Sequence, residues 1–86
     1  MPEICRFLGV VIKMFYDEHN PPHFHAEYAE YKAAIRISDY ALLEGKLPPK
    51  IFGIVIEWAS QHQDELKAEW ELAREHKPLI KIKPLE

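Results

Sequence analysis

Two Pro-Pro pairs, Pro21-Pro22 and Pro48-Pro49, limit where regular secondary structure can run in this chain. Proline lacks the backbone N–H that helices and sheets need, and it drives the residue before it toward an extended conformation. The first pair therefore predicts a loop. The second pair is typical of the first turn of a helix, where proline is favoured.

Residues 24–37 alternate in character as a β-hairpin does. A two-residue turn at Ala29-Glu30 would set the strand register, although neither residue readily accepts a positive φ. The expected pairs are Phe24 with Ile35, Ala26 with Ala33 and Tyr28 with Tyr31 on the core face, and His23 with Arg36, His25 with Ala34 and Glu27 with Lys32 on the other.

Three further strands are expected around this hairpin. Residues 4–8 suggest a short first strand, and the nearly continuous apolar run at 10–16 suggests a central strand buried on both faces. Residues 40–43 suggest one more short strand, which Gly45 would follow. Together these strands would span about residues 3–44 and form a mostly antiparallel sheet.

The second half of the chain has a helical apolar period. We expect one long helix over about residues 48–75 that packs on one face of the sheet. His62-Gln63-Asp64 is the weakest part of the pattern, and Asp64 could cap a second segment there. Leu79, Ile80 and Ile82 predict a short final strand over about residues 79–83. The prediction is a single α+β domain covering residues 1–86.

Size and composition narrow the functional classes. A chain of 86 residues with 48 % hydrophobic residues can form a core, but its stability margin is thin, so a homodimer or a permanent protein partner would be a natural supplement. The single cysteine fits a reducing compartment. No secretory signal or membrane-spanning stretch is recognisable, and we expect a cytoplasmic protein with no membrane contact. A net charge of −3 does not support a broad RNA-binding surface.

The segment at 17–25 is the strongest candidate for a functional site. Three of the five histidines fall within seven positions around the first proline pair, in the block Asp17-Glu18-His19-Asn20-Pro21-Pro22-His23-Phe24-His25. His23 and His25 are two apart on a strand, so both rings would point to one face. His19 could fold back over the prolines, and Asp17 or Glu18 could add an oxygen. Such ligands suit a divalent metal such as zinc.

Other interpretations of the same residues stay open. His19, His23 and His25 could instead supply acid and base catalysis for RNA cleavage, with Arg36 stabilising the transition-state charge. The loop and the sheet edge could also form a protein-binding module without catalysis. In the plainest interpretation, the histidines only cap the turn and fill a half-buried sheet face.

The chain resembles a known family across nearly its whole length. The residues that carry the resemblance are Pro2-Glu3-Ile4, Arg6-Phe7, the block at 17–26, Glu30-Tyr31-Lys32-Ala33, Glu44-Gly45-Lys46-Leu47-Pro48, Glu57-Trp58, Trp70-Glu71-Leu72-Ala73-Arg74, Pro78-Leu79, Ile82 and Pro84-Leu85. They resemble the domain-of-unknown-function family numbered 4160. Ala29 departs from the pattern, because a glycine is expected there.

The resemblance implies a functional setting rather than a known activity. Members of this family are small bacterial and archaeal proteins, often encoded beside a small protein of the family numbered 2442. That arrangement implies a toxin–antitoxin-like two-gene module with a small partner protein encoded nearby. We therefore expect a cytoplasmic component of such a module whose site is the histidine loop, with the non-catalytic protein-binding module as the alternative.

Overall fold

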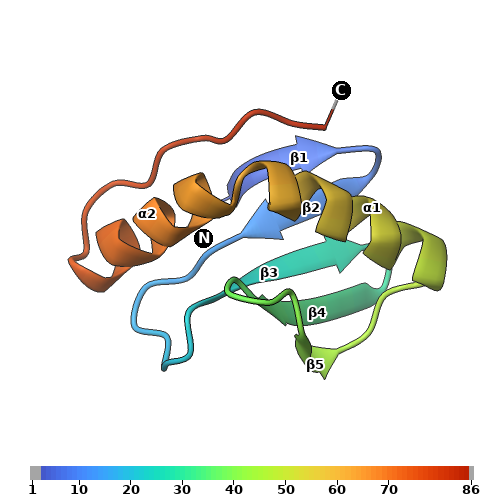
Figure 1. The fold of residues 1–86 in the computed structure, drawn as a ribbon, viewed down its shortest axis with the longest axis horizontal. Coiled ribbons are helices and arrows are strands. Elements are labelled where there is room, and N and C mark those ends of the chain that lie inside the picture. The colour runs from blue at the N-terminus through green and yellow to red at the C-terminus, as the bar shows by residue number, and fades with distance from the viewer. Residues whose placement is uncertain (1–2, 86) are drawn as a thin grey trace.

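A computed structural model describes residues 3–85 of the chain. Within these residues, one antiparallel sheet is followed by two helices, and Figure 1 shows both helices on the same face of the sheet. The elements are β1 (Glu3–Phe7), β2 (Val10–Lys13), β3 (His23–Tyr28), β4 (Tyr31–Arg36), β5 (Leu42–Gly45), α1 (Pro49–Gln61) and α2 (Gln63–Arg74), with the strands in the spatial order 1-2-3-4-5. The α+β prediction is confirmed.

The hairpin of β3 and β4 has the register that the alternation predicts, and all six expected pairs are present. The connection is the two-residue turn Ala29-Glu30, in which Ala29 takes a φ of 52°. This is the left-handed region that glycine favours. The core-facing residues Phe24, Ala26 and Ile35 are fully buried.

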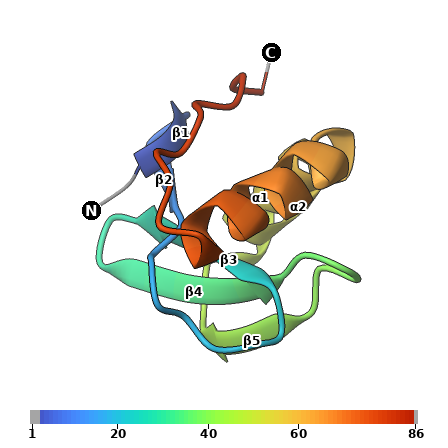
Figure 2. The ribbon, with the colours of Figure 1, turned by 90° about the vertical axis from the view of Figure 1, so that its left-hand side faces the viewer.

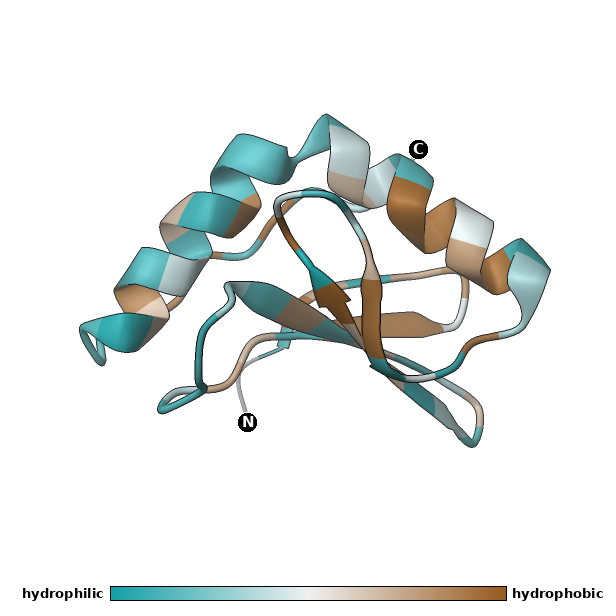
Figure 3. Ribbon diagram, turned by 60° about the horizontal axis from the view of Figure 1, so that its bottom comes forward, coloured by the Kyte–Doolittle hydropathy of each residue, from teal (hydrophilic) through white to brown (hydrophobic). Residues whose placement is uncertain are grey.

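The core lies between the sheet and the helices, and Figure 3 shows the apolar side of α1 turned toward the strands. Trp58 of α1 is its largest fully buried side chain, and its ring centroid lies 6.1 Å from that of Phe24. Full burial of a phenylalanine side chain stabilises a fold by about 1.5–3 kcal/mol. The indole N–H of Trp58 donates to the carbonyl of Lys83 at 2.8 Å, so the C-terminal segment closes over this core.

The expected single long helix is a pair of helices that meet at His62. This residue leaves the helical conformation, with φ −130° and ψ 26°. The break falls in the weak stretch of the apolar pattern, but no side chain caps α2, so the expectation of an Asp64 cap is wrong. Tertiary contacts account for the break, because the side-chain amide of Gln63 donates to the backbone carbonyls of Ile37 and Ser38 at 3.0 and 3.2 Å.

Three strand predictions need correction. The run at 10–16 is a strand only over Val10–Lys13, because Lys13 pairs with His25 close to the start of β3 and the chain then leaves the sheet. The strand expected at 40–43 lies at Leu42–Gly45. Residues 79–83 form no strand: the Ile82 N–H bonds to the carbonyl of Ile4 in β1, but the Ile80 N–H bonds to the Glu69 carboxylate of α2.

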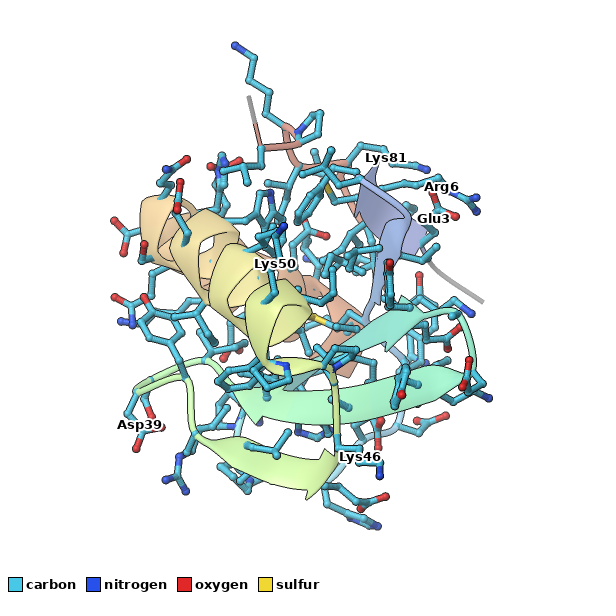
Figure 4. The ribbon with its side chains drawn as sticks, turned by 90° about the vertical axis from the view of Figure 1, so that its right-hand side faces the viewer. Glu3, Arg6, Asp39, Lys46, Lys50 and Lys81 are labelled. Carbon is cyan, nitrogen blue, oxygen red and sulfur yellow. The ribbon has the colours of Figure 1, made fainter. Side chains whose placement is uncertain are left out.

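The C-terminal segment nevertheless runs back beside β1 (Figure 1). Figure 4 shows Lys81 of this segment near Glu3 and Arg6, which pair with each other at 2.8 Å. The arginine lowers the pKa of the Glu3 carboxyl below its usual value, mainly through their hydrogen bond. No helix within residues 3–85 is long and apolar enough to cross a membrane.

Candidate metal centre

The loop between β2 and β3 lies at one end of the sheet, where α2 extends past the strands (Figures 1 and 2). The first half of this loop contacts the residues that follow α2. Tyr16 stacks on His76 with ring centroids 5.7 Å apart, and its hydroxyl donates to the carbonyl of Lys77 at 3.1 Å. Asp17 lies 3.0 Å from His76 and has a φ of 63°, so the chain turns sharply just before Glu18.

Glu18 and two histidines of β3 converge in space. Oε1 of Glu18 lies 2.5 Å from Nε2 of His25 and 3.5 Å from Nε2 of His23. One donor atom from each of the three residues can be chosen so that all lie within 4.8 Å of one another. The two imidazole centroids are 5.1 Å apart, as two residues on the same face of a strand allow.

The second nitrogen of His23 is also engaged. Nδ1 lies 2.7 Å from the carbonyl oxygen of Pro21, which follows a cis peptide bond from Asn20. A carbonyl oxygen only accepts hydrogen bonds, so we assign the proton to Nδ1. In the neutral ring, Nε2 then holds a free lone pair on the side that faces Glu18. Metal-binding histidines are usually oriented in this way.

Aromatic rings surround the cluster. His23 is only 9 % exposed, and its ring centroid lies 5.2 Å from that of Trp70 on α2. Phe15 makes an edge-on contact with His25 at 4.6 Å between centroids. Burial raises the pKa of the Glu18 carboxyl, but the hydrogen bond and charge of His25 and the nearby His23 outweigh burial. The net pKa of Glu18 lies below its usual value, so the carboxylate is ionised at neutral pH.

The arrangement fits a divalent cation with two imidazoles and one carboxylate as ligands. In a tetrahedral zinc site with ligand bonds of about 2.0–2.1 Å, donor atoms lie about 3.3 Å apart, so Glu18 and His25 would separate by about 0.8 Å to admit the ion. Three protein ligands leave a coordination position for water, as in catalytic zinc sites. A cavity of about 210 Å³ opens beside Glu18 and gives that position room; Phe15, Asp17, Glu18, Trp70, Ala73 and Arg74 line it.

The structure brings together only some of the residues that the sequence singled out. His23 and His25 meet, but His19 is exposed and lies outside the cluster. Asp17 pairs with His76, and Glu18 is the acid beside the histidines. Arg36 is the strand partner of His23 as predicted, but its guanidinium bonds Asp39 through two nitrogens at 2.8 and 2.9 Å.

Sequence reasoning missed three contributors. Trp70 looked like a core or interface residue because it continues the apolar face of the helix, and nothing in the sequence placed it against a histidine. Arg74 lines the cavity although it belongs to the last turn of α2. The Pro21 carbonyl could not be predicted, because every residue has a backbone carbonyl and the sequence does not show which one contacts His23.

Comparison with known proteins identifies the family. Neither a curated protein nor a solved structure shows a significant match to this chain. The family model described as Domain of unknown function (DUF4160) matches residues 9–71, which include all three residues of the candidate centre. Because the match covers well over half of the sequence, the chain belongs to the DUF4160 family.

Proposed function

We propose that this protein binds one divalent cation of the zinc class through Glu18, His23 and His25, and that the bound ion activates water or polarises a substrate. The convergence of these three side chains at the start of β3 is the observation that supports the proposal. When bound, such an ion lowers the pKa of its water toward neutrality. The protein's own part is to hold the ligands and to leave one position open to the cavity.

The organisation around His23 favours a metal over a metal-free acid and base pair. The bond to the Pro21 carbonyl holds the Nε2 lone pair toward Glu18, which suits a ligand. A metal-free cleavage of RNA would need a cation for the phosphorane, and Arg36, the residue expected in that role, is already neutralised by Asp39. We therefore propose that the bound ion, and not Arg36, stabilises the charge of the transition state.

Calorimetric titration of the metal-free protein with Zn²⁺ tests the proposal. One equivalent should bind, and His23→Ala, His25→Ala and Glu18→Gln should each weaken binding at least about a hundredfold, because each removes one of three ligands. His19→Ala is the matched control, since it removes an imidazole from the same loop but outside the cluster. Equal losses for His19→Ala and His23→Ala, or no stoichiometric binding, would contradict the proposal.

We further propose that the protein acts in the bacterial cytoplasm as one component of a toxin–antitoxin-like two-gene module. This setting rests on the resemblance to the family numbered 4160, whose members are often encoded beside a small protein of the family numbered 2442. If the proposal is right, expression of the chain alone and together with the neighbouring small protein should affect growth differently. Identical growth in both cases would count against the module.

Partner binding is a second candidate function, and the edge of the sheet favours it. β5 is the last strand of the sheet in the described chain, and its Leu42 and Leu43 are 45 % and 39 % exposed. An exposed edge strand is a template for strand addition by another chain. Leu43→Lys should then weaken binding of the protein encoded nearby at least about tenfold. Leu8→Lys is the control, because Leu8 is exposed in the turn between β1 and β2, away from β5.

A further inference from the structure

The cavity beside Glu18 has one basic side chain and three apolar walls. Arg74 is the base, and Phe15, Trp70 and Ala73 are the walls. Asp17 and Glu18 complete the lining, so with histidines neutral the cavity has a formal charge of −1 when empty and +1 once a divalent ion joins Glu18. An ion at the centre would thus reverse the preference of this cavity from cations to anions.

Arg74 is poorly satisfied by its present partner. Its nearest carboxylate oxygen is on Glu71 at 3.5 Å, the outer limit of a hydrogen bond, and its side chain is 57 % exposed. A guanidinium is a planar fork that binds phosphate or carboxylate through two parallel hydrogen bonds. Arg74 can therefore turn toward a ligand in the cavity at little cost.

The volume limits what the cavity accepts. Its volume is about 210 Å³. This room suits one oxyanion group with a small apolar body against Phe15 and Trp70. A larger ligand would extend into solvent past Arg74.

From these observations we propose that the cavity is an anion subsite, in which Arg74 holds a phosphate or carboxylate group of the substrate while the ion bound at Glu18, His23 and His25 contacts the same molecule. This inference rests on the metal centre proposed above and names the chemical class of its substrate. Phosphate and carboxylate share the recognising chemistry, and the probes below separate them.

The test uses the full-length protein loaded with Co²⁺, whose visible absorption responds to a new ligand at the ion. Metal affinity is measured first for every variant, and inorganic phosphate and acetate are then titrated separately. Arg74→Gln should bind Co²⁺ as wild type does but bind the better anion about tenfold more weakly, and Arg74→Lys should recover part of that loss. Lys67→Gln is the matched control, because it makes the same charge change on α2 but lines a different cavity.

Each outcome bears on a specific claim. Stronger binding of phosphate than of acetate assigns a phosphoryl substrate, and the reverse assigns a carboxylate. If Co²⁺ binds but neither anion does, or if Arg74→Gln and Lys67→Gln weaken the anion equally, the anion subsite is wrong and the metal centre stands. If Co²⁺ itself does not bind, both proposals fail together.

Discussion

Nε2 of His25 and Oε1 of Glu18 lie 2.5 Å apart, and this contact joins the loop before β3 to the strand itself. In the metal-free protein it is an imidazole–carboxylate hydrogen bond between two partly buried side chains. The same two atoms are the proposed ligands of a cation. The contact therefore has separate consequences for stability and for metal binding.

The stability of the metal-free protein should depend on Glu18 in acid. The pKa of the Glu18 carboxyl is below its ordinary 4.5 in the folded protein, so its stabilising contribution is present above about pH 4.5 and is lost as the pH falls through the folded value. Urea unfolding at pH 7 and pH 3.5 with a chelator should show a smaller acid loss for Glu18→Gln than for wild type. Glu30→Gln, at the exposed hairpin turn, is the control and should behave as wild type does. Equal acid losses in all three proteins would rule out this role.

Replacing Ala29 by glycine should stabilise the protein. Ala29 has a φ of 52°, where a Cβ costs about 1–2 kcal/mol and glycine does not, although glycine loses more entropy on folding. The expected net gain is about 0.5–1 kcal/mol in the free energy of unfolding, measured with urea. Glu30→Gly, at the neighbouring turn position where φ is not positive, should give no gain. A loss of stability in Ala29→Gly would show that the turn is not formed as described.

The buried Glu69 side chain should hold the C-terminal segment against α2 through a hydrogen bond. The side chain is only 3 % exposed, and it accepts the Ile80 N–H at 3.0 and 3.2 Å. Glu69→Ala leaves that N–H without its acceptor and should cost about 1–3 kcal/mol. Glu69→Gln keeps an acceptor oxygen and should be far milder.

The contribution of Glu69 to stability should depend on pH in the opposite direction to that of Glu18. Burial raises the pKa of Glu69 more than the Ile80 hydrogen bond lowers it, so the folded protein binds this proton more tightly than the unfolded chain does. The Glu69 carboxyl therefore contributes most to stability below its pKa in the unfolded chain. This contribution is lost as the pH rises through its pKa in the folded protein. Chemical unfolding between pH 4 and 8 checks this, and a Glu69→Gln variant with the same pH slope as wild type would contradict it.

The pair of Arg36 and Asp39 should be visible in an NMR titration of carboxyl groups. Hydrogen bonds from Arg36 and from the Ala41 N–H lower the pKa of Asp39 from 3.8 to about 2. In Arg36→Gln the midpoint should move back toward 3.8. The pair adds to stability above about pH 4, and this contribution disappears between pH 4 and pH 2. If Asp39 of the wild type titrates near 3.8, Arg36 is free for the role in catalysis that the sequence suggested.

The sequence predicted the hairpin register well, because alternation and a two-residue turn leave one pairing that buries Phe24, Ala26 and Ile35 together. It predicted the ends of elements poorly. The helix breaks at His62 because Gln63 is tied to the carbonyls of Ile37 and Ser38, which are more than twenty residues away in the sequence. Of the apolar residues at 79–83, Ile82 is buried and bonds to β1, whereas Ile80 is 65 % exposed; the apolar run in the sequence does not distinguish such an irregular segment from a strand.

The candidate site was predictable only in the part that lies on a strand. His23 and His25 share a face because of the period of two, whatever the loop does. Which acid joins them depends on the positive φ of Asp17 and on the contact of Asp17 with His76, which lies just after α2. His19 has no such anchor among residues 3–85 and stays exposed.

The most direct test of the metal centre is the NMR chemical shift of the imidazole nitrogens as Zn²⁺ is added to ¹⁵N-labelled protein. Nε2 of His23 and Nε2 of His25 should shift together and reach saturation at one equivalent. Nδ1 of His23 should keep its proton, because the Pro21 carbonyl accepts it. The nitrogens of His19 should not move. Coordination through His19, or through Nδ1 of His23, or no shift at either strand histidine, would contradict a metal centre at Glu18, His23 and His25.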